Sequence, residues 1–318
     1  MTISKFDPQN PFDCFIVQSE AMKSAVENAK RFAMFDAPLL IQGETGSGKD
    51  LLAKACHYQS LRRDKKFIAV NCAGLPDEDA ESEMFGRKVG DSETTGFFEY
   101  ANKGTVLLDG IAELSLSLQA KLLRFLTDGS FRRVGEEKEH YANVRVICTS
   151  QVPLHLLVEQ GKVRADLFHR LNVLTINVPA LRDRMADIEP LAQGFLQEIS
   201  EELKIAKPTF DKDFLLYLQK YDWKGNVREL YNTLYRACSL VQDNHLTIES
   251  LNLALPQSAV ISLDEFENKT LDEIIGSYEA QVLKLFYAEY PSTRKLAQRL
   301  GVSHTAIANK LKQYGIGK

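Results

Sequence analysis

The chain has 318 residues, of which 44% are hydrophobic and 26% charged, with a formal net charge of −4. These are the proportions of globular proteins, so they exclude a disordered or collagen-like chain, and the length predicts two or three domains. The N-terminal sequence lacks the basic and apolar regions of a secretory signal. No stretch approaches the about 18 apolar residues that a membrane-spanning helix needs.

The cysteines and the charges are distributed unevenly. The five cysteines are too far apart for a zinc-type pair or a disulfide framework, which predicts a cytoplasmic protein. The last 28 residues carry six basic residues and no acidic one, which leaves −10 for the first 290 residues. A solvated tail would explain this end as well as a binding module would. An acidic body with a basic end also indicates a polyanion partner that only the C-terminal end contacts.

Short apolar runs alternate with helical patterns over the first 180 residues, as expected for strands buried in a parallel sheet. Ser19 is expected to cap the first helix. The alternation predicts a doubly wound α/β domain. Strands are expected at 37–42, 66–71, 105–108, 144–149 and 173–178. We expect a tail over 1–13, an α/β subdomain over 14–184, a subdomain of helices only over 185–255, a linker over 256–268 and a final helical domain over 269–318.

A glycine-rich segment lies between an expected strand and an expected helix. In that context, backbone N–H groups can surround a phosphate chain, and Lys49 adds a positive charge at the terminal phosphates. This favours a nucleotide site over a chance match. Asp50 stands where the general pattern has the Ser or Thr that binds magnesium. The residues expected to contact the nucleotide are Gly43, Glu44, Thr45, Gly46, Ser47, Gly48, Lys49 and Asp50.

A second acid of such a site is expected at the end of a later strand. Asp109 ends the apolar run 105–108 and would bind Mg²⁺ together with ATP, although a lone Asp there is more often a turn residue. Gly110 follows it, where comparable ATPases usually have a glutamate that orients the attacking water. Loss of a general base typically lowers the rate by about 10²–10⁴-fold and barely changes nucleotide affinity. Glu113 is the acid that could compensate. We therefore expect ATP to bind and to be hydrolysed weakly.

Several segments together resemble the central domain of bacterial enhancer-binding proteins, an AAA+ ATPase family, from about Cys14 to Leu255. Phe67-Ile-Ala-Val-Asn-Cys-Ala73 resembles the second strand of the family, with Asn71 at the "glutamate switch" position. Val144-Arg-Val-Ile-Cys-Thr-Ser-Gln151 resembles the sensor I strand, with Gln151 where Asn is usual. The resemblance implies an AAA+ P-loop fold, with a doubly wound parallel sheet and an α-helical lid.

Two further segments carry arginines. Arg164-Ala-Asp-Leu-Phe-His-Arg-Leu-Asn172 resembles the segment with the arginine fingers, which would be Arg164 and Arg170. Fingers act on the nucleotide of a neighbouring subunit, so the resemblance implies assembly into a ring or part of a ring. Trp223-Lys-Gly-Asn-Val-Arg-Glu-Leu230 resembles sensor II, which gives Arg228 a phosphate-facing role. Each arginine alone would more often be a surface salt-bridge residue.

One departure from the family concerns its output loop. Members that drive the sigma-N form of RNA polymerase carry a loop that reads Gly-Ala-Phe-Thr-Gly-Ala. Here the stretch 81–86 is followed by a shorter loop over 87–96, with Asp91 and Glu93 expected at an acidic tip. This loop and Gly110 disfavour the alternative function, an ATP-hydrolysing sigma-N-type activator.

Within the family, the combination resembles the tyrosine-responsive regulators of aromatic amino acid genes. The resemblance implies a repressor, in a short form without the N-terminal regulatory portion, whose dimers assemble into larger oligomers with ATP and L-tyrosine. Phenylalanine and tryptophan are further candidate effectors, and RNA polymerase is a further candidate partner. A phosphatase or other hydrolase finds no support, because the sequence shows no nucleophile–base set.

The C-terminal segment has helix-turn-helix spacing and resembles the Fis-type module, an all-α domain. Gly301 permits the tight turn. A small core is expected from Leu296, Leu300, Val302, Ile307 and Leu311. A hairpin that packs elsewhere is the alternative, but the basic residues favour double-stranded DNA.

Within this module, two sets of residues are expected to contact a palindromic operator. We expect Ser303 as N-cap and His304, Thr305, Asn309 and Lys310 towards the major groove. The phosphate contacts are expected from Arg294, Lys295 and Lys312. The preceding helix carries an apolar stripe, which is either core or, as the Fis resemblance favours, a dimer interface. The stripe consists of Leu271, Ile274, Ile275, Tyr278, Val282, Leu285 and Phe286.

Overall fold

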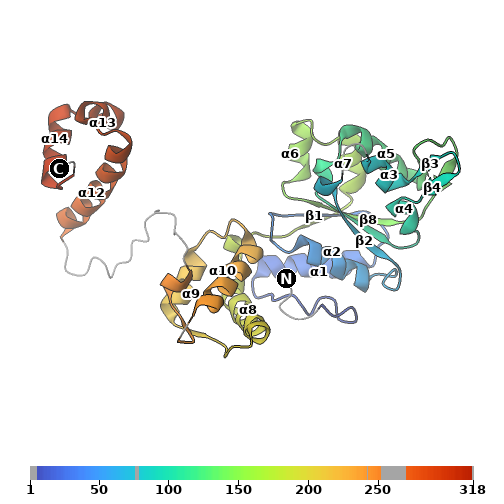
Figure 1. Cartoon of the computed structure of the whole chain (residues 1–318), viewed down its shortest axis with the longest axis horizontal. Helices are drawn as coiled ribbons and strands as arrows, with labels where there is room; N and C mark the ends of the chain where they lie inside the picture. The colour runs from blue at the N-terminus through green and yellow to red at the C-terminus, as the bar shows by residue number, and fades with distance from the viewer. Residues whose placement is uncertain (1–5, 76–78, 242, 252–269, 317–318) are drawn as a thin grey trace. The chain divides into compact units, whose positions relative to one another are not determined.

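The computed structural model of the chain describes residues 6–75, 79–241, 243–251 and 270–316 (Figure 1). It forms two compact units, Met1–Leu253 and Ala254–Lys318. The expected linker over 256–268 lies outside the described residues. In the described ranges, no helix is both long enough and apolar enough to cross a bilayer.

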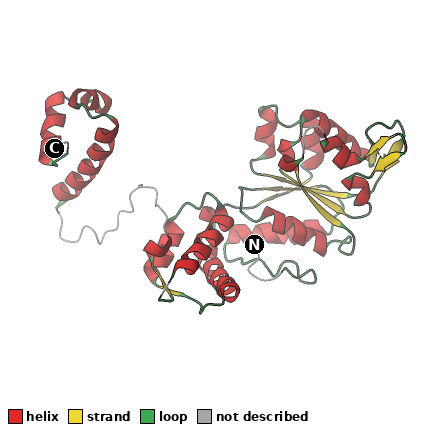
Figure 2. Ribbon diagram, in the orientation of Figure 1, coloured by secondary structure: helices red, strands yellow, loops and turns green. Residues whose placement is uncertain are grey.

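The first unit is built on a five-stranded parallel sheet in the order β2-β5-β8-β1-β9 (Figure 2). Its strands agree with the five expected ones to within two residues at either end. The crossovers between parallel neighbours confirm the doubly wound α/β prediction. The strands are β1 (Leu39–Gln42), β2 (Phe67–Asn71), β5 (Thr105–Asp109), β8 (Arg145–Ser150) and β9 (Leu174–Asn177).

Helices cover both faces of the main sheet (Figure 1), and alternate residues of its strands pack with opposite helical layers. Leu39 and Ile41 pack with one layer, whereas Leu40 packs with the other. Because helices cover both faces, the strands are apolar on both sides, which is why the sequence shows them as nearly continuous apolar runs. One layer is α1 (Glu20–Ala33) and α2 (Lys49–Gln59). The other is α3 (Ala80–Phe85), α4 (Phe97–Tyr100), α5 (Leu116–Asp128), α6 (Leu154–Glu159) and α7 (Ala165–Leu171).

Short polar strands were not predicted. Two antiparallel hairpins lie outside the main sheet: β3 (Arg87–Val89) with β4 (Ser92–Thr94), and β6 (Ser130–Arg132) with β7 (Glu139–Tyr141). With three residues each and no apolar run, these strands carry no periodic signal. By contrast, the expected cap of α1 is confirmed, because the Ser19 hydroxyl accepts the Met22 N–H at 3.4 Å.

The remainder of the first unit is a helical lid packed around the fully buried Trp223. Its helices are α8 (Ile188–Leu203), α9 (Lys212–Lys220), α10 (Asn226–Leu240) and α11 (Ile248–Leu251). The prediction of helices only was wrong in one detail. The two-residue strands β10 (Thr209–Phe210) and β11 (His245–Leu246) pair in parallel, and a pair this short has no sequence signature.

The second unit consists of α12 (Leu271–Glu289), α13 (Thr293–Leu300) and α14 (His304–Gln313). Gly301 has a φ of 67°, and the Ser303 hydroxyl accepts the Ala306 N–H at 3.2 Å, so the expected turn and cap are confirmed. Val302, expected in the core, is 46% exposed, because it lies in the turn and on neither helix. The buried core is Leu283, Leu296, Ala297, Ile307 and Leu311.

Candidate nucleotide-binding site and DNA-binding helices

The glycine-rich segment joins the end of β1 to the start of α2. Gly46 and Gly48 have φ values of 76° and 107°, which favour glycine. At Gly46 a Cβ would also lie 2.2 Å from the carbonyl oxygen of Gly225, so a larger residue would push the lid away. The N–H groups at the start of α2 remain available to an anion, as in other phosphate-binding loops.

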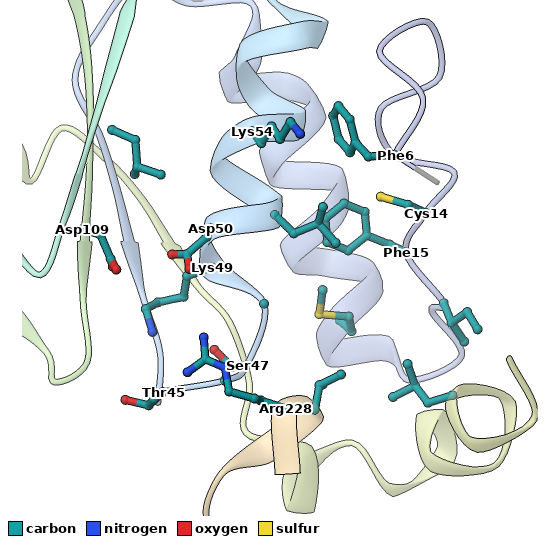
Figure 3. A pocket seen from close by; sticks show the side chains of 18 of the residues that line it. Phe6, Cys14, Phe15, Thr45, Ser47, Lys49, Asp50, Lys54, Asp109 and Arg228 are labelled. Carbon is teal, nitrogen blue, oxygen red and sulfur yellow. The ribbon is translucent and has the colours of Figure 1, made fainter. Parts of the chain in front are cut away.

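A cavity of about 600 Å³ opens beside this loop (Figure 3). It brings together most of the residues expected from the sequence, although they come from four separate parts of the chain. These are Thr45, Gly46, Ser47, Gly48, Lys49, Asp50, Asp109, Gln151 and Arg228. Gly43 and Glu44, also expected at the nucleotide, are not among the residues that line it.

The charged groups of the cavity face one another. Lys49 is 6% exposed and donates to the Glu44 carbonyl at 2.9 Å, and burial lowers its pKa. Burial, and then the charge of Asp109, raise the pKa of Asp50. Two carboxylates at a buried ammonium suit a hard cation, and Mg²⁺ typically takes one or two carboxylates plus phosphate oxygens. The residues therefore fit a magnesium ion that arrives with a nucleotide.

Two buried polar groups of the cavity have no hydrogen-bond partner within the described part of the chain. They are the Ser47 hydroxyl and the Arg184 Nε, on residues that are 2% and 4% exposed. Leaving a buried polar group unpaired costs about 1–3 kcal/mol. Phosphate oxygens would satisfy both. Arg184 was not predicted as a site residue, because it follows the last strand and belongs to none of the motifs.

The side chain of Glu44 bonds to residues at the junction between the sheet and the lid. Its carboxylate accepts Arg182 Nη1 at 2.8 Å and Asn226 Nδ2 at 3.1 Å. The Arg182 hydrogen bonds, and then the Asn226 one, lower the pKa of Glu44 to about 2. Arg184 Nη2 also donates to the Ser47 carbonyl at 2.9 Å. The junction between sheet and lid is thus bonded directly to the phosphate loop.

The far end of the cavity is apolar. Cys14, Phe15 and Ile16 line it from the N-terminal segment, and Phe195 lines it from the lid. Figure 3 shows Phe15 and Cys14 on the opposite side of α2 from Asp109. Asp187 fixes this segment, because its carboxylate accepts the Gln18 and Ser19 N–H groups at 2.6 and 2.7 Å. Such a surface suits a flat heterocycle.

Three positions expected to affect hydrolysis, Gly110, Glu113 and Asn71, do not line the cavity, but Gly110 directly follows its lining residue Asp109. Gly110 has a φ of 77°, and its N–H donates to the Thr149 hydroxyl at 3.0 Å. The side chain of Glu113 is close, since its Cγ would lie 3.5 Å from a Cβ at Gly110, but Glu113 is not among the lining residues. Asn71 lies level with Asp109 on the neighbouring strand, and its Oδ1 accepts the Ala73 N–H at 3.2 Å.

The two arginines expected as fingers do not reach the cavity of their own chain. Arg164 is the N-cap residue of α7, and Arg170 lies in its last turn. Arg164 donates to both oxygens of Asp166, at 3.0 and 2.7 Å, and Arg170 donates to the Leu126 carbonyl at 2.8 Å. Their action on a neighbouring subunit stays a prediction.

The loop over 87–96 differs from its expected form in one respect. Glu93 lies on β4 opposite Lys88, and the 6% exposed Arg133 donates to its carboxylate. Arg133 also binds Glu99 at 2.9 Å. The tip of the hairpin is therefore formed by Gly90 and Asp91 without Glu93, because the buried guanidinium draws Glu93 to the stem.

In the second unit, most residues expected at DNA are exposed. They are Arg294, Lys295, Ser303, His304, Thr305, Asn309 and Lys312. Lys310 differs, because its ammonium group is bound to Glu279 of α12. Of the apolar stripe on α12, Leu271, Ile275 and Val282 are exposed, whereas Phe286 packs against the core. The side chains of Ile274, Tyr278 and Leu285 lie outside the described residues.

Comparison with known proteins agrees with this architecture. Residues 15–177 match the family model "Sigma-54 interaction domain", residues 182–265 the "AAA+ ATPase lid domain" and residues 268–317 a "Helix-turn-helix domain". NtrX of Brucella abortus, solved in complex with ATP, is 32% identical with a TM-score of 0.70, over 95% of this chain and 69% of that one.

Among curated proteins, the "HTH-type transcriptional regulatory protein TyrR" of Haemophilus influenzae is 98% identical over 318 residues, the full length of both chains. The protein of the same description from Enterobacter agglomerans is 50% identical over 98% of this chain, and the chain spans 60% of its length. The chain therefore belongs to the TyrR family of DNA-binding transcriptional regulators, with an AAA+ sigma-54 interaction domain, an AAA+ lid and a helix-turn-helix domain.

Proposed function

We propose that the cavity binds ATP with Mg²⁺. The triphosphate would lie along the loop 43–50, with Lys49 and Arg228 as its cations and Asp50 and Asp109 at the metal. The apolar end at Phe15 would hold the adenine. The unpaired Ser47 hydroxyl and Arg184 Nε support this assignment, because phosphate oxygens supply the partners that they lack. The ATP complex of NtrX also supports it.

In this proposal the protein uses the binding of ATP and hydrolyses it only slowly. At the position of Gly110, comparable ATPases have a glutamate whose carboxylate orients the attacking water. Gly110 has no side chain to do so, and hydrolysis would therefore be slow. The fold still allows a rival function, an ATP-driven activator of sigma-54 RNA polymerase, which the family description favours. Two features count against this rival. The hairpin 87–94 is short and polar and is held by the bonds of Arg133 to Glu93 and Glu99, and Gly110 lacks the carboxylate for hydrolysis. ATP hydrolysis at the rate of an ordinary AAA+ motor would decide for the rival.

We infer that the regulator is mainly a repressor of genes for aromatic amino acid synthesis and transport. The observation that carries this proposal is the 98% identity over the full length of a TyrR protein. ATP and L-tyrosine would promote assembly of dimers into larger oligomers that cover promoters. An effector can do this only if it binds the assembled state more tightly than the unassembled one.

Two surfaces support assembly. The exposed Leu271, Ile275 and Val282 are spaced by four and seven residues, so they share one face of α12 and would pair two chains into a dimer. A two-fold dimer would bind half-sites about 34 Å apart, or a multiple of that. Arg164 and Arg170 are exposed on α7 and would contact the nucleotide of the next chain in the larger oligomer.

The test is sedimentation of the purified chain with ATP alone, with L-tyrosine alone and with both. We expect the larger species only with both ligands. Phenylalanine and tryptophan serve as matched effectors, and Lys49→Met serves as the control for ATP. An unchanged size distribution would refute the gating. Mapping of the bound sites across a genome tests the targets separately, since sites unrelated to aromatic metabolism would refute them.

A further inference from the structure

The recognition helix α14 has two different faces. Thr305, Asn309 and Lys312 are exposed and are spaced by four and three residues, so they lie on one face. Lys310 is half-buried and lies towards α12. The sequence groups Lys310 with Thr305 and Asn309 towards the major groove, whereas the structure separates Lys310 from both of them.

The carboxylate of Glu279 on α12 holds this second face. One oxygen accepts the Lys310 ammonium, and the other accepts the Tyr314 hydroxyl at 2.7 Å. The Tyr314 ring passes close to Gly276, whose Cβ, if present, would lie 3.6 Å from the phenol oxygen. Both carboxylate oxygens are therefore engaged by groups at the C-terminal end of α14.

The charges reinforce this geometry. The Lys310 hydrogen bond, and then the Tyr314 one, lower the pKa of Glu279, and Glu279 raises the pKa of Tyr314. Hence the carboxylate stays ionised and the phenol stays protonated at neutral pH. If Lys310 left Glu279 to contact a phosphate, the negative charge of the carboxylate would no longer be neutralised and would lie near the polyanion, and like charges repel.

We propose that Glu279 is a positioning residue for DNA binding, which fixes α14 through Lys310 and Tyr314 so that the face with Thr305, Asn309 and Lys312 meets the duplex. The charge of Lys310 is then neutralised inside the protein and not by a phosphate. This inference rests on the proposed contact between the C-terminal helices and DNA.

The salt dependence of binding separates the two roles. Each protein cation that neutralises a phosphate contributes about 0.9 to the slope of log K against log salt concentration. A variant that no longer contacts one phosphate therefore has a lower slope. A variant in which the helix is poorly positioned instead has an affinity that is lower by the same factor at every salt concentration, with an unchanged slope.

The experiment is fluorescence anisotropy of the full chain with a labelled duplex of about 40 base pairs of arbitrary sequence, between about 50 and 300 mM KCl, a range in which phosphate contacts dominate the salt dependence. Lys312→Gln is the matched phosphate-contact variant, and we expect it to lower the slope by about 0.9 per bound chain. The double variant Glu279→Gln with Lys310→Met should keep the wild-type slope with several-fold weaker binding. The single variant Lys310→Arg, which retains an ion pair with Glu279, should bind the duplex with the affinity of the wild-type chain.

The possible results test the positioning role of Glu279 separately from the proposed DNA contact. A slope that falls as much in the double variant as in Lys312→Gln would show that Lys310 contacts a phosphate, and would overturn the inference while DNA binding stands. Wild-type protein that does not bind the duplex would refute the proposed DNA contact, and the inference with it. Tyr314→Phe provides a second variant that leaves every charge in place, and it should weaken binding without a change in slope. Unaltered affinity in both Tyr314→Phe and the double variant would also overturn the inference.

Discussion

Asn226 allows the bonding between lid and phosphate loop to be tested quantitatively. It is fully buried and has a φ of 54°. Its Oδ1 accepts the Leu181 N–H at 2.7 Å, and its Nδ2 donates to Glu44 and to the Thr45 carbonyl at 3.1 Å each. We expect Asn226→Ala to destabilise the first unit and to weaken ATP binding, because the lid would no longer be fixed against the loop.

The magnitude follows from two contributions. Loss of the acceptor leaves the buried Leu181 N–H unpaired, which costs about 1–3 kcal/mol. An alanine in the left-handed region costs a further 1–2 kcal/mol, roughly. The expected decrease in the free energy of unfolding is therefore about 2–5 kcal/mol in Asn226→Ala. Asn226→Gly should be destabilised by about 1–2 kcal/mol less, since glycine removes only the backbone contribution.

The assay is chemical denaturation of the full chain, followed by fluorescence. Trp223 is the only tryptophan in the sequence, and it is fully buried three residues before Asn226, so its emission reports this region directly. Nucleotide affinity is measured on the same variants. An Asn226→Ala protein destabilised by less than about 1 kcal/mol would refute the reasoning, because neither the unpaired N–H nor the strained backbone would then matter.

Three further predictions concern other parts of the first unit. Gly110→Glu should raise the rate of ATP hydrolysis by at least about tenfold with little change in affinity, whereas Gly110→Ala should not; equal rates would contradict the role of the missing carboxylate. Glu44 has a folded pKa of about 2 against an ordinary value of 4.5, so its contribution to stability is complete above pH 4.5 and is lost as the pH falls towards 2. In Glu44→Gln the unfolding midpoint should lack the part of the pH dependence between pH 4.5 and 2 that Glu44 causes. A variant whose midpoint depends on pH as the wild-type midpoint does would contradict this role of Glu44. Arg133→Met should speed amide hydrogen exchange in the hairpin 87–94 without a change in ATP affinity, and equal protection would show that the ion pairs do not fix the hairpin.

The sheet and the phosphate loop could be predicted because their signals are local. Each central strand is buried on both faces and contains a short apolar run, and the loop needs glycine at Gly46 and Gly48 for reasons of backbone conformation. Asp109 could be placed because it ends a strand in a chain that also carries the phosphate loop. The cavity confirms that these separate motifs meet at one site.

Other features depend on contacts between distant residues and leave no local trace. Glu44 reads as a phosphate-loop residue, yet it bonds to Arg182 and Asn226, which are 138 and 182 residues away. The same holds for Lys310, whose partner Glu279 lies 31 residues earlier on another helix. Composition shows that a residue is charged, but only the fold shows which charge it meets.

The bonds between loop and lid bear on how a nucleotide could control assembly. In the described chain, the Ser47 carbonyl accepts from Arg184, and the Gly46 carbonyl accepts the Val227 N–H at 3.1 Å, next to Arg228. A nucleotide that draws Ser47 or Arg228 towards its phosphates therefore acts on the same backbone that holds the lid. Because Arg184 and Arg228 both line the cavity, the phosphates of a bound nucleotide would be linked to the position of the lid without any need for hydrolysis. If the proposed nucleotide binds here, it would therefore shift the lid on binding alone, which is what a regulator that senses ATP without consuming it requires.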